Sequence, residues 1–219
     1  MRNELQASGQ RVALVSRAGL DLSRLEQRYS HAGLSLQGNA MAPWSVRQLY
    51  YACDEQRPRL FDQGLSAFLL GMSSPEGGYV SAVFLPDEAS APLEQAALDD
   101  RRALALLAPT YSANAYAWSQ RYQNCNQWVA EMLAMAWGGT PTGDDARAQA
   151  QAWLRGQGYA AHEFHIAFPP TMWLAAVIPW VHHDDHPSEN LAQAIYRVSM
   201  PSSLEAFARQ RWPQARRVE

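Results

Sequence analysis

The sequence predicts an α+β fold in which an antiparallel sheet packs against helices. Short apolar segments with strand-like patterns occur up to residue 86, whereas the longer apolar segments with helical spacing follow residue 90. This separation of strands from helices is typical of the α+β class. Neither an internal repeat nor a long linker divides the 219 residues, so we expect a single domain over 1–219.

The early part of the chain predicts most of the sheet. Gly38-Asn39 marks a turn between two alternating segments, which we therefore expect to pair as a hairpin. Asp21 is a candidate N-cap for a helical turn over 21–28. Residues 59–71 predict a short helix or an irregular connection. The expected strands are 11–19, 29–37, 44–53 and 78–86, the last of which ends at Pro86.

The late part of the chain predicts helices separated by polar loops. The strongest helical pattern covers 125–137 and is stopped by Gly138-Gly139. A polar loop with several aromatic residues, 110–124, precedes it, and a second polar loop covers 182–191. IYRVSMP (195–201) predicts a late strand. The other expected helices cover 91–109, 142–158 and 202–212.

Composition excludes several classes of protein. Hydrophobic residues make up 47% and charged residues 18%, which is typical of globular rather than disordered chains. A net charge of −3 gives no indication of a nucleic-acid partner. The two cysteines form no CxxC zinc motif, and nothing else in the sequence calls for a cofactor.

The sequence also bears on membranes and location. FPPTMWLAAVIPW (168–180) is broken by prolines and is shorter than the roughly 20 apolar residues that a transmembrane helix needs. MRNELQASGQ at the start lacks the apolar core of a signal peptide. The chain as written is therefore expected to be soluble and cytoplasmic. If a signal peptide has been removed, the protein is expected to be periplasmic or secreted.

Cys125 is the first candidate for chemistry, because it falls where the 125–137 helix begins. Unpaired backbone N–H groups and the positive end of the helix dipole lower the pKa of a thiol at that place, and the thiolate is the reactive form. Asn124, Asn126 or the backbone N–H of Cys125 could donate hydrogen bonds to a developing oxyanion. A cysteine hydrolase then needs an imidazole to take and return the proton.

His31 is the candidate for that imidazole. It lies in YSHAG at the head of an expected strand, where small residues leave space around the ring, while the other five histidines lie late in the chain. Papain-like folds place the cysteine at a helix N-terminus and the histidine at the start of a strand that packs against the helix. Here His31 precedes Cys125, which is the order of the circularly permuted branch of that fold.

Several separated motifs resemble the bacterial domain-of-unknown-function family 2145 over residues 11 to 207. They are RAGLDLS (17–23), RYSHAG (28–33), YQNCNQWV (122–129), AQAWLRGQGY (150–159) and DDHP (184–187). More distantly, SHAG and NCNQW are similar to permuted NlpC-type papain-like proteins, which include peptidases, amidases and lipid acyltransferases. That resemblance implies a circularly permuted papain-like fold, with Cys125 as nucleophile and His31 as base.

Four further residues complete the expected site. Gln48 is the candidate third member of the triad, because it is polar and lies mid-strand on the segment expected to pair with 29–37. Trp118 and Tyr122 lie in the loop before the cysteine helix and could line a substrate groove. Asp21 is an N-cap, a partner for Arg17, or a residue that borders the site.

Each candidate also has a structural alternative. Cys125 could be an inert buried thiol, and His31 a hydrogen-bonded core histidine. Cys53, at a strand end, could pack in the core or form a disulfide with Cys125. HHDDHP (182–187) supplies ligand types for a divalent metal, but is more simply a turn whose Asp and His side chains bond backbone groups.

These observations predict a thiol hydrolase or acyltransferase that acts on an amide or ester bond. Cys125 would form an acyl-enzyme, and His31, oriented by Gln48, would move the proton. Cell-wall peptides and lipids are both open as substrates. The alternatives are an inactive papain-like module that binds peptide or lipid, and a metal-dependent protein centred on 182–186.

Overall fold

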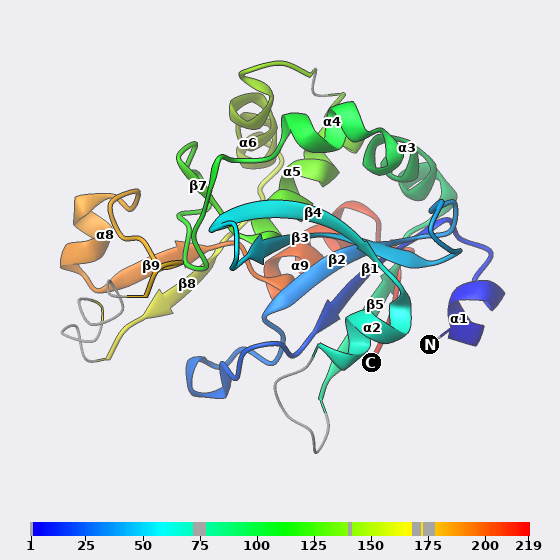
Figure 1. Ribbon diagram of the computed structural model, residues 1–219, viewed down its shortest axis with the longest axis horizontal. Coiled ribbons are helices and arrows are strands. Elements are labelled where there is room, and N and C mark those ends of the chain that lie inside the picture. The colour runs from blue at the N-terminus through cyan, green and yellow to red at the C-terminus, as the bar shows by residue number, and fades with distance from the viewer. Residues whose placement is uncertain (1, 72–77, 140–141, 168–171, 173–177) are drawn as a thin grey trace.

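The centre of the fold is a six-stranded antiparallel sheet. The computed structural model describes residues 2–71, 78–139, 142–167, 172 and 178–219. With helices packed against the sheet, the predicted α+β class is confirmed (Figure 1). In spatial order the strands are β10 (Arg216–Val218), β5 (Val80–Phe84), β1 (Val12–Arg17), β2 (His31–Leu36), β3 (Ser45–Ala52) and β4 (Arg57–Gln63).

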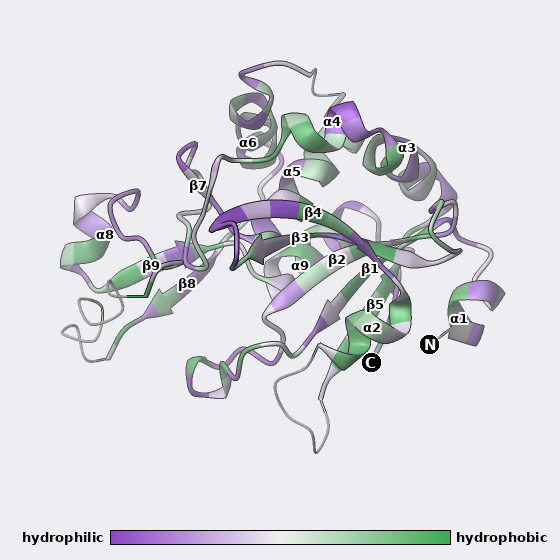
Figure 2. Cartoon of the chain, in the orientation of Figure 1, coloured by the Kyte–Doolittle hydropathy of each residue, from purple (hydrophilic) through white to green (hydrophobic). Residues whose placement is uncertain are grey.

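Helices cover both faces of this sheet. Leu14 of β1 joins a buried cluster with Trp128 of the central helix α5, whereas its neighbour Val15 joins a second cluster with Phe68 of α2. Successive residues of a strand point to opposite faces, so β1 contributes to both cores. In Figure 2 the short helix α2 is mostly hydrophobic, and its Phe68 is buried in the second cluster. The helices are α1 (Arg2–Ala7), α2 (Leu65–Leu70), α3 (Asp87–Leu98), α4 (Asp100–Ala105), α5 (Cys125–Gly138), α6 (Ala146–Gly156), α8 (Ser188–Ala192) and α9 (Pro201–Arg211).

The helix α5 begins and ends as the sequence predicts. The Asn124 side chain accepts a hydrogen bond from the backbone N–H of Gln127, at 2.7 Å, which caps the first turn. Gly139 follows the last turn at φ +64°, in the left-handed region that favours glycine. The cap therefore fixes Cys125 as the first residue of the helix.

The expected helix over 91–109 is two helices. The Asp99 carboxylate accepts hydrogen bonds from the backbone N–H groups of Arg101 and Arg102. It caps α4, so the helical pattern is interrupted at Asp99, between α3 and α4.

Residues 59–71 contain a strand as well as a helix, so the expectation of a helix or an irregular connection is wrong for their first part. β4 pairs with β3 along its length, and α2 follows it. β4 is the edge strand, so no further strand would need a hydrogen bond from Pro58, which has no backbone N–H. Most side chains of this edge strand are exposed or half-buried, so the sequence lacks the apolar alternation that would have predicted the strand.

A second, smaller sheet projects from the main body (Figure 1). It pairs β8 (His162–His165), which the sequence did not predict, with β9 (Ile195–Val198), which it did. The predicted loop over 182–191 contains α8. Within the predicted loop 110–124, β6 (Thr110–Tyr111) and β7 (Tyr122–Gln123) form a short parallel pair just before α5.

Within the described residues, none of the helices combines the length and apolar character of a membrane span. Most of the proline-broken segment 168–180 lies outside these residues.

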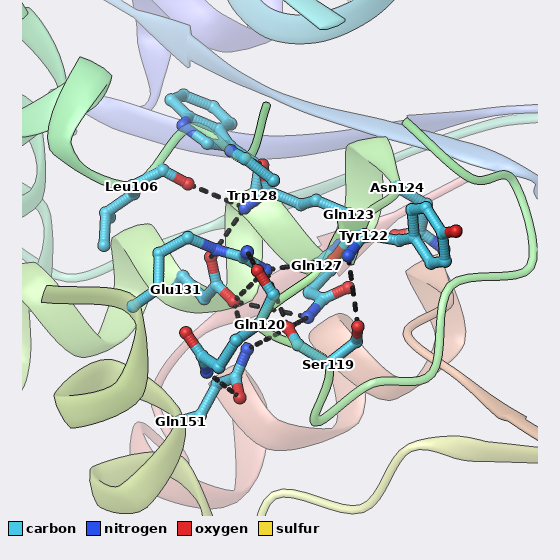
Figure 3. Close-up of polar contacts among 12 residues, drawn as sticks. Leu106, Ser119, Gln120, Tyr122, Gln123, Asn124, Gln127, Trp128, Glu131 and Gln151 are labelled. Atoms are coloured by element: carbon cyan, nitrogen blue, oxygen red, sulfur yellow. Dashed lines mark hydrogen bonds and ion pairs between the residues drawn. The ribbon is translucent and has the colours of Figure 1, made fainter. Parts of the chain in front are cut away.

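A buried ion pair fixes the chain that leads into α5 (Figure 3). Glu131 of α5 is fully buried, and Arg147 of α6 donates to both of its carboxylate oxygens, at 3.0 and 3.1 Å. Gln123, Gln127 and Gln151 also donate to this carboxylate. Burial raises the pKa of Glu131, and Arg147 opposes that rise.

Arg147 also binds the segment immediately before the cysteine. Its guanidinium donates to the backbone carbonyls of Ser119, Gln120 and Tyr122. The network therefore joins α6, α5 and the segment from 119 to 123, and it sets the path on which the chain reaches Cys125.

Replacing Arg147 by Met should destabilise the protein by about 3–5 kcal/mol, because Glu131 would be left buried without its ion-pair partner. Urea denaturation would measure this loss. Arg59→Met is the matched control, since its partner Glu55 lies at the surface, and it should cost far less. Equal losses in the two variants would contradict a structural role for the buried pair.

Candidate active site

Cys125 lies at the first turn of α5 and is only 5% exposed. Burial raises the pKa of its thiol to about 11, although the backbone N–H groups of Asn126, Ala32 and Cys125 and the charge of Arg17 all act to lower it. The expectation of a lowered thiol pKa at the helix N-terminus is therefore wrong. The helix effect is present, but desolvation of the buried sulfur is larger.

His31 begins β2, and its ring is held by Gln48 of β3. The His31 Nε2 and Gln48 Oε1 atoms are 2.5 Å apart. Gln48 Nε2 donates to Gln63 Oε1 at 2.6 Å, which turns the Gln48 carbonyl oxygen toward the imidazole. An oxygen that accepts requires the hydrogen on Nε2, so Nδ1 carries the lone pair that a general base needs.

The surroundings keep His31 neutral. Burial and the nearby charge of Arg17 lower the pKa of His31 to about 4, and the bond to Gln48 opposes this only in part. At neutral pH the imidazole and the Cys125 thiol are therefore both uncharged. Among the described residues, no hydrogen bond joins the two directly.

Asn126 brings the two candidates together. Its Oδ1 accepts from the backbone N–H of Ala32 at 3.0 Å, and its Nδ2 donates to the carbonyl of Ser30 at 3.1 Å. These are the residues on either side of His31. The amide thus ties the first turn of α5 to the start of β2, and it seats Cys125 beside the histidine strand.

Asn124 does not supply the expected side-chain donor for an oxyanion. Its Nδ2 donates to the carbonyls of Ala113 and Ser199, each at 3.2 Å, while its Oδ1 caps the helix. Both N–H groups of the amide are therefore engaged. The backbone N–H groups of Cys125 and Asn126, which lie toward the sulfur, are the better candidates.

A mainly apolar cavity of about 250 Å³ opens beside Cys125. Its walls come from the loop before β2, from the β8–β9 sheet and from the start of α5. Leu20 and Leu25 line it and are also exposed, so they stand at its rim. The other apolar and aromatic lining residues are Leu22, Tyr111, Ala113, Phe164, Ile166, Val181, Tyr196, Val198 and Met200.

The three expected substrate-binding residues lie outside the lining of this cavity. Trp118 packs against Tyr159, with ring centroids 6.0 Å apart and Arg155 over its face. Tyr122 is buried and stacks on His182 at 4.4 Å. Asp21 is exposed and accepts a hydrogen bond from the backbone N–H of Ser23, in the turn that precedes a short 3-10 helix.

Cys53 and Cys125 are both free thiols, so the alternative disulfide is not formed. Cys53 is exposed rather than packed in the core, which corrects that expectation.

The segment 182–186 is fastened to the backbone around it. Asp185 accepts from the backbone N–H of Tyr116, and His186 contacts the carbonyl of Asn114 at 2.7 Å. His183 contacts the Tyr196 hydroxyl at 2.6 Å. These contacts match the turn interpretation. No group of three or more potential metal ligands occurs in the part of the chain that the structure describes.

Sequence reasoning missed two residues of this site. Gln63, which orients Gln48, lies on the edge strand that the pattern did not reveal. Tyr111 of β6 lies close to the thiol, and its pKa is raised well above the usual value, first by burial and then by Cys125. A correct strand prediction for β4 would have placed Gln63 near Gln48.

Protein stability should depend on His31 as the pH falls. Because the pKa of His31 is about 4 in the folded state and about 6.5 when exposed, the unfolded chain binds the proton first. Stability is then full above pH 6.5 and falls by up to about 3 kcal/mol as the pH drops to 4. Urea denaturation of the wild type and of His31→Gln between pH 7 and 4 measures this difference. Parallel pH curves would contradict a buried neutral His31, since the five other histidines are present in both proteins.

Comparisons with known proteins identify a family but no characterised relative. Searches of curated proteins and of solved structures found no match. The family described as "Uncharacterized protein conserved in bacteria (DUF2145)" matches residues 4–208. This match spans nearly the whole chain, and the protein therefore belongs to that bacterial family.

Proposed function

We propose that the protein is a thiol hydrolase or acyltransferase of the permuted papain-like type, with Cys125 as nucleophile and His31 as general base. The observation that carries the proposal is the orientation of His31. Its Nε2 is bound by Gln48, Nδ1 remains available, and Asn126 fastens the cysteine helix to both neighbours of the histidine. A nucleophile, a base and a group that orients the base are the parts such chemistry needs.

The proton moves during attack rather than before it. Both groups are neutral at rest, so the sulfur forms its bond to the substrate carbonyl carbon as its proton passes to His31 Nδ1. The carbonyl π electrons move to the oxygen, where backbone N–H groups at the start of α5 stabilise the charge. Collapse expels the leaving group, which takes the proton from His31.

The second half of the reaction repeats these roles. Water, or an acceptor alcohol or amine, gives its proton to His31 and attacks the thioester carbonyl carbon. The tetrahedral species then releases Cys125, which recovers its proton from the imidazole. The acceptor alone decides whether the product is that of a hydrolase or of an acyltransferase.

The cavity supports an apolar acyl group more than a polar cell-wall peptide. Its walls are mostly aliphatic and aromatic, and burying an acyl chain gains about 0.8 kcal/mol per methylene group. Rim residues Leu20 and Leu25 extend this apolar surface outward. Lipid-type amides and esters are therefore the favoured substrates of the two classes that the sequence left open.

Acylation of Cys125 by p-nitrophenyl octanoate tests the proposal. Intact-protein mass spectrometry should show one octanoyl adduct in Cys53→Ser, which leaves a single thiol. Cys125→Ala should give none, and His31→Asn should slow adduct formation by about 10²–10⁴-fold. p-Nitrophenyl acetate, which leaves the cavity empty, should react more slowly than octanoate. No adduct on Cys125 with either ester would overturn the proposal.

Gln48 can be tested by a matched pair of variants. Gln48→Leu removes the acceptor for His31 and should lower the acylation rate by about tenfold or more. Gln48→Glu keeps an acceptor but adds a negative charge, which favours the imidazolium and raises the pKa of His31. The acidic limb of the pH–rate profile should therefore move to higher pH. An unchanged acidic limb in Gln48→Glu would argue against His31 as the base.

One observation favours a second candidate, an inactive binding module with the same scaffold. The thiol pKa of about 11 and the imidazole pKa of about 4 mean that no reactive ion pair exists at rest. A binding module would hold an apolar ligand in the cavity equally well in the wild type and in Cys125→Ala, with no covalent adduct. Octanoic acid titrated into both proteins, alongside the ester experiment, separates the two functions.

A further inference from the structure

Arg17 lies beside the candidate pair and has no part in the chemistry described so far. It is the last residue of β1 and is the cross-strand partner of His31. Its guanidinium lies over the ring of Phe68, 5.2 Å from the centroid, and the His31 ring contacts the same phenyl ring at 5.9 Å. The two side chains therefore share one face of the sheet.

Two nitrogens of this guanidinium are buried without a hydrogen-bond acceptor. Arg17 is only 7% exposed, and the unpartnered atoms are Nε and Nη1. No carboxylate of the described residues pairs with it. Arg147 shows the usual arrangement in the same protein, since it is equally buried but binds a carboxylate and several carbonyls. An unpaired buried cation costs stability, so a role beyond folding has to account for Arg17.

The surrounding chain leaves room for this cation. A Cβ atom added to Gly71 would lie 2.9 Å from the guanidinium carbon, and one added to Gly19 would lie 3.4 Å from Nη1. Ser30 holds the Gly19 turn in place by accepting hydrogen bonds from the backbone N–H groups of Gly19 and Leu20. A larger residue at Gly71 or Gly19 would therefore crowd the Arg17 guanidinium.

The charge of Arg17 acts on both members of the candidate pair. Arg17 lowers the pKa of Cys125 and also lowers the pKa of His31. It therefore favours the thiolate over the thiol and the neutral imidazole over the imidazolium. Tyr50 and Tyr111 are the other titratable groups near this charge and the thiol.

We propose that Arg17 is a positioning residue whose fixed charge stabilises the negative charge that develops on the Cys125 sulfur while His31 takes the proton. This inference deepens the proposed function, because it rests on Cys125 as the nucleophile. In a preformed ion pair, an imidazolium attracts the thiolate. Here the charge of Arg17 supplies part of that attraction, so His31 stays neutral and can accept the proton.

Alkylation of Cys125 by iodoacetamide tests Arg17 without any substrate. At pH 8 to 9, below the ionisation of the thiol, the rate is proportional to the thiolate fraction. Arg17→Met should alkylate about five- to tenfold more slowly than the wild type, whereas Arg17→Lys, which keeps the charge, should stay within about twofold. Peptide mass spectrometry reads Cys125 and Cys53 in the same sample, and Cys53 should not change.

A control variant and a stability measurement distinguish an effect of the Arg17 charge on Cys125 from a loss of protein stability. Arg59→Met changes the net charge equally at an exposed site and should leave the Cys125 rate unchanged. Because no carboxylate of the described residues pairs with Arg17, Arg17→Met should unfold at the same temperature as the wild type or higher. A purely structural arginine would lower both stability and reactivity when lost. If Arg17→Met does not fold, Arg17→Gln serves as the neutral variant with the same expected slowing.

The proposal is overturned if the neutral variant alkylates at the wild-type rate, or if Arg17→Lys is as slow as the neutral variant. These outcomes are distinct from failure of the proposed function. If the neutral Arg17 variant alkylates more slowly but the wild type forms no octanoyl adduct, only the acyl-transfer chemistry is contradicted. If the wild type forms the adduct but the neutral variant alkylates at the same rate, only the role of Arg17 is contradicted.

Discussion

One side-chain amide joins the first turn of α5 to the start of β2. Asn126 binds the chain on both sides of His31, with one acceptor and one donor. The first turn of a helix thereby extends the hydrogen bonding of a strand end. The neighbouring cysteine and histidine come from distant parts of the chain, and this amide sets their relation. The rest of the site depends on that junction.

Burial shapes the chemistry as strongly as geometry does. The helix terminus, the backbone N–H groups and Arg17 all favour a charged sulfur, yet desolvation outweighs them in the closed site. The resting protein thus holds two neutral partners and a fixed cation. Such a site is protected from adventitious alkylation and oxidation, since these reactions need a thiolate. In the proposed reaction, charge develops only when a carbonyl group is present to receive the attack.

Patterns that reflect local structure were the most predictable from the sequence. Gly138-Gly139 as the stop of α5 and the hairpin around Gly38 follow from the preferences of single residues, and the structure has both of them. Gln48 was predicted to orient His31 because it is polar and lies on the strand expected to pair with the histidine strand, and the two side chains are in contact. The edge strand β4 and the short strand β8 could not be found, because neither carries a clear buried pattern. The thiol pKa and the role of Asn124 depend on tertiary burial and on partners from distant segments, such as Ser199.

The small β8–β9 sheet has a consequence for how such proteins can diversify. Its strands contribute Phe164, Tyr196 and Val198 to the cavity wall, whereas the proposed nucleophile and base belong to α5 and the large sheet. In the proposed function, part of the selectivity is therefore encoded apart from the reacting residues. Substitutions in the small sheet can reshape what the cavity accepts while the reacting atoms keep their places. Within one bacterial family, a single reaction centre could thus serve ligands of very different length and shape.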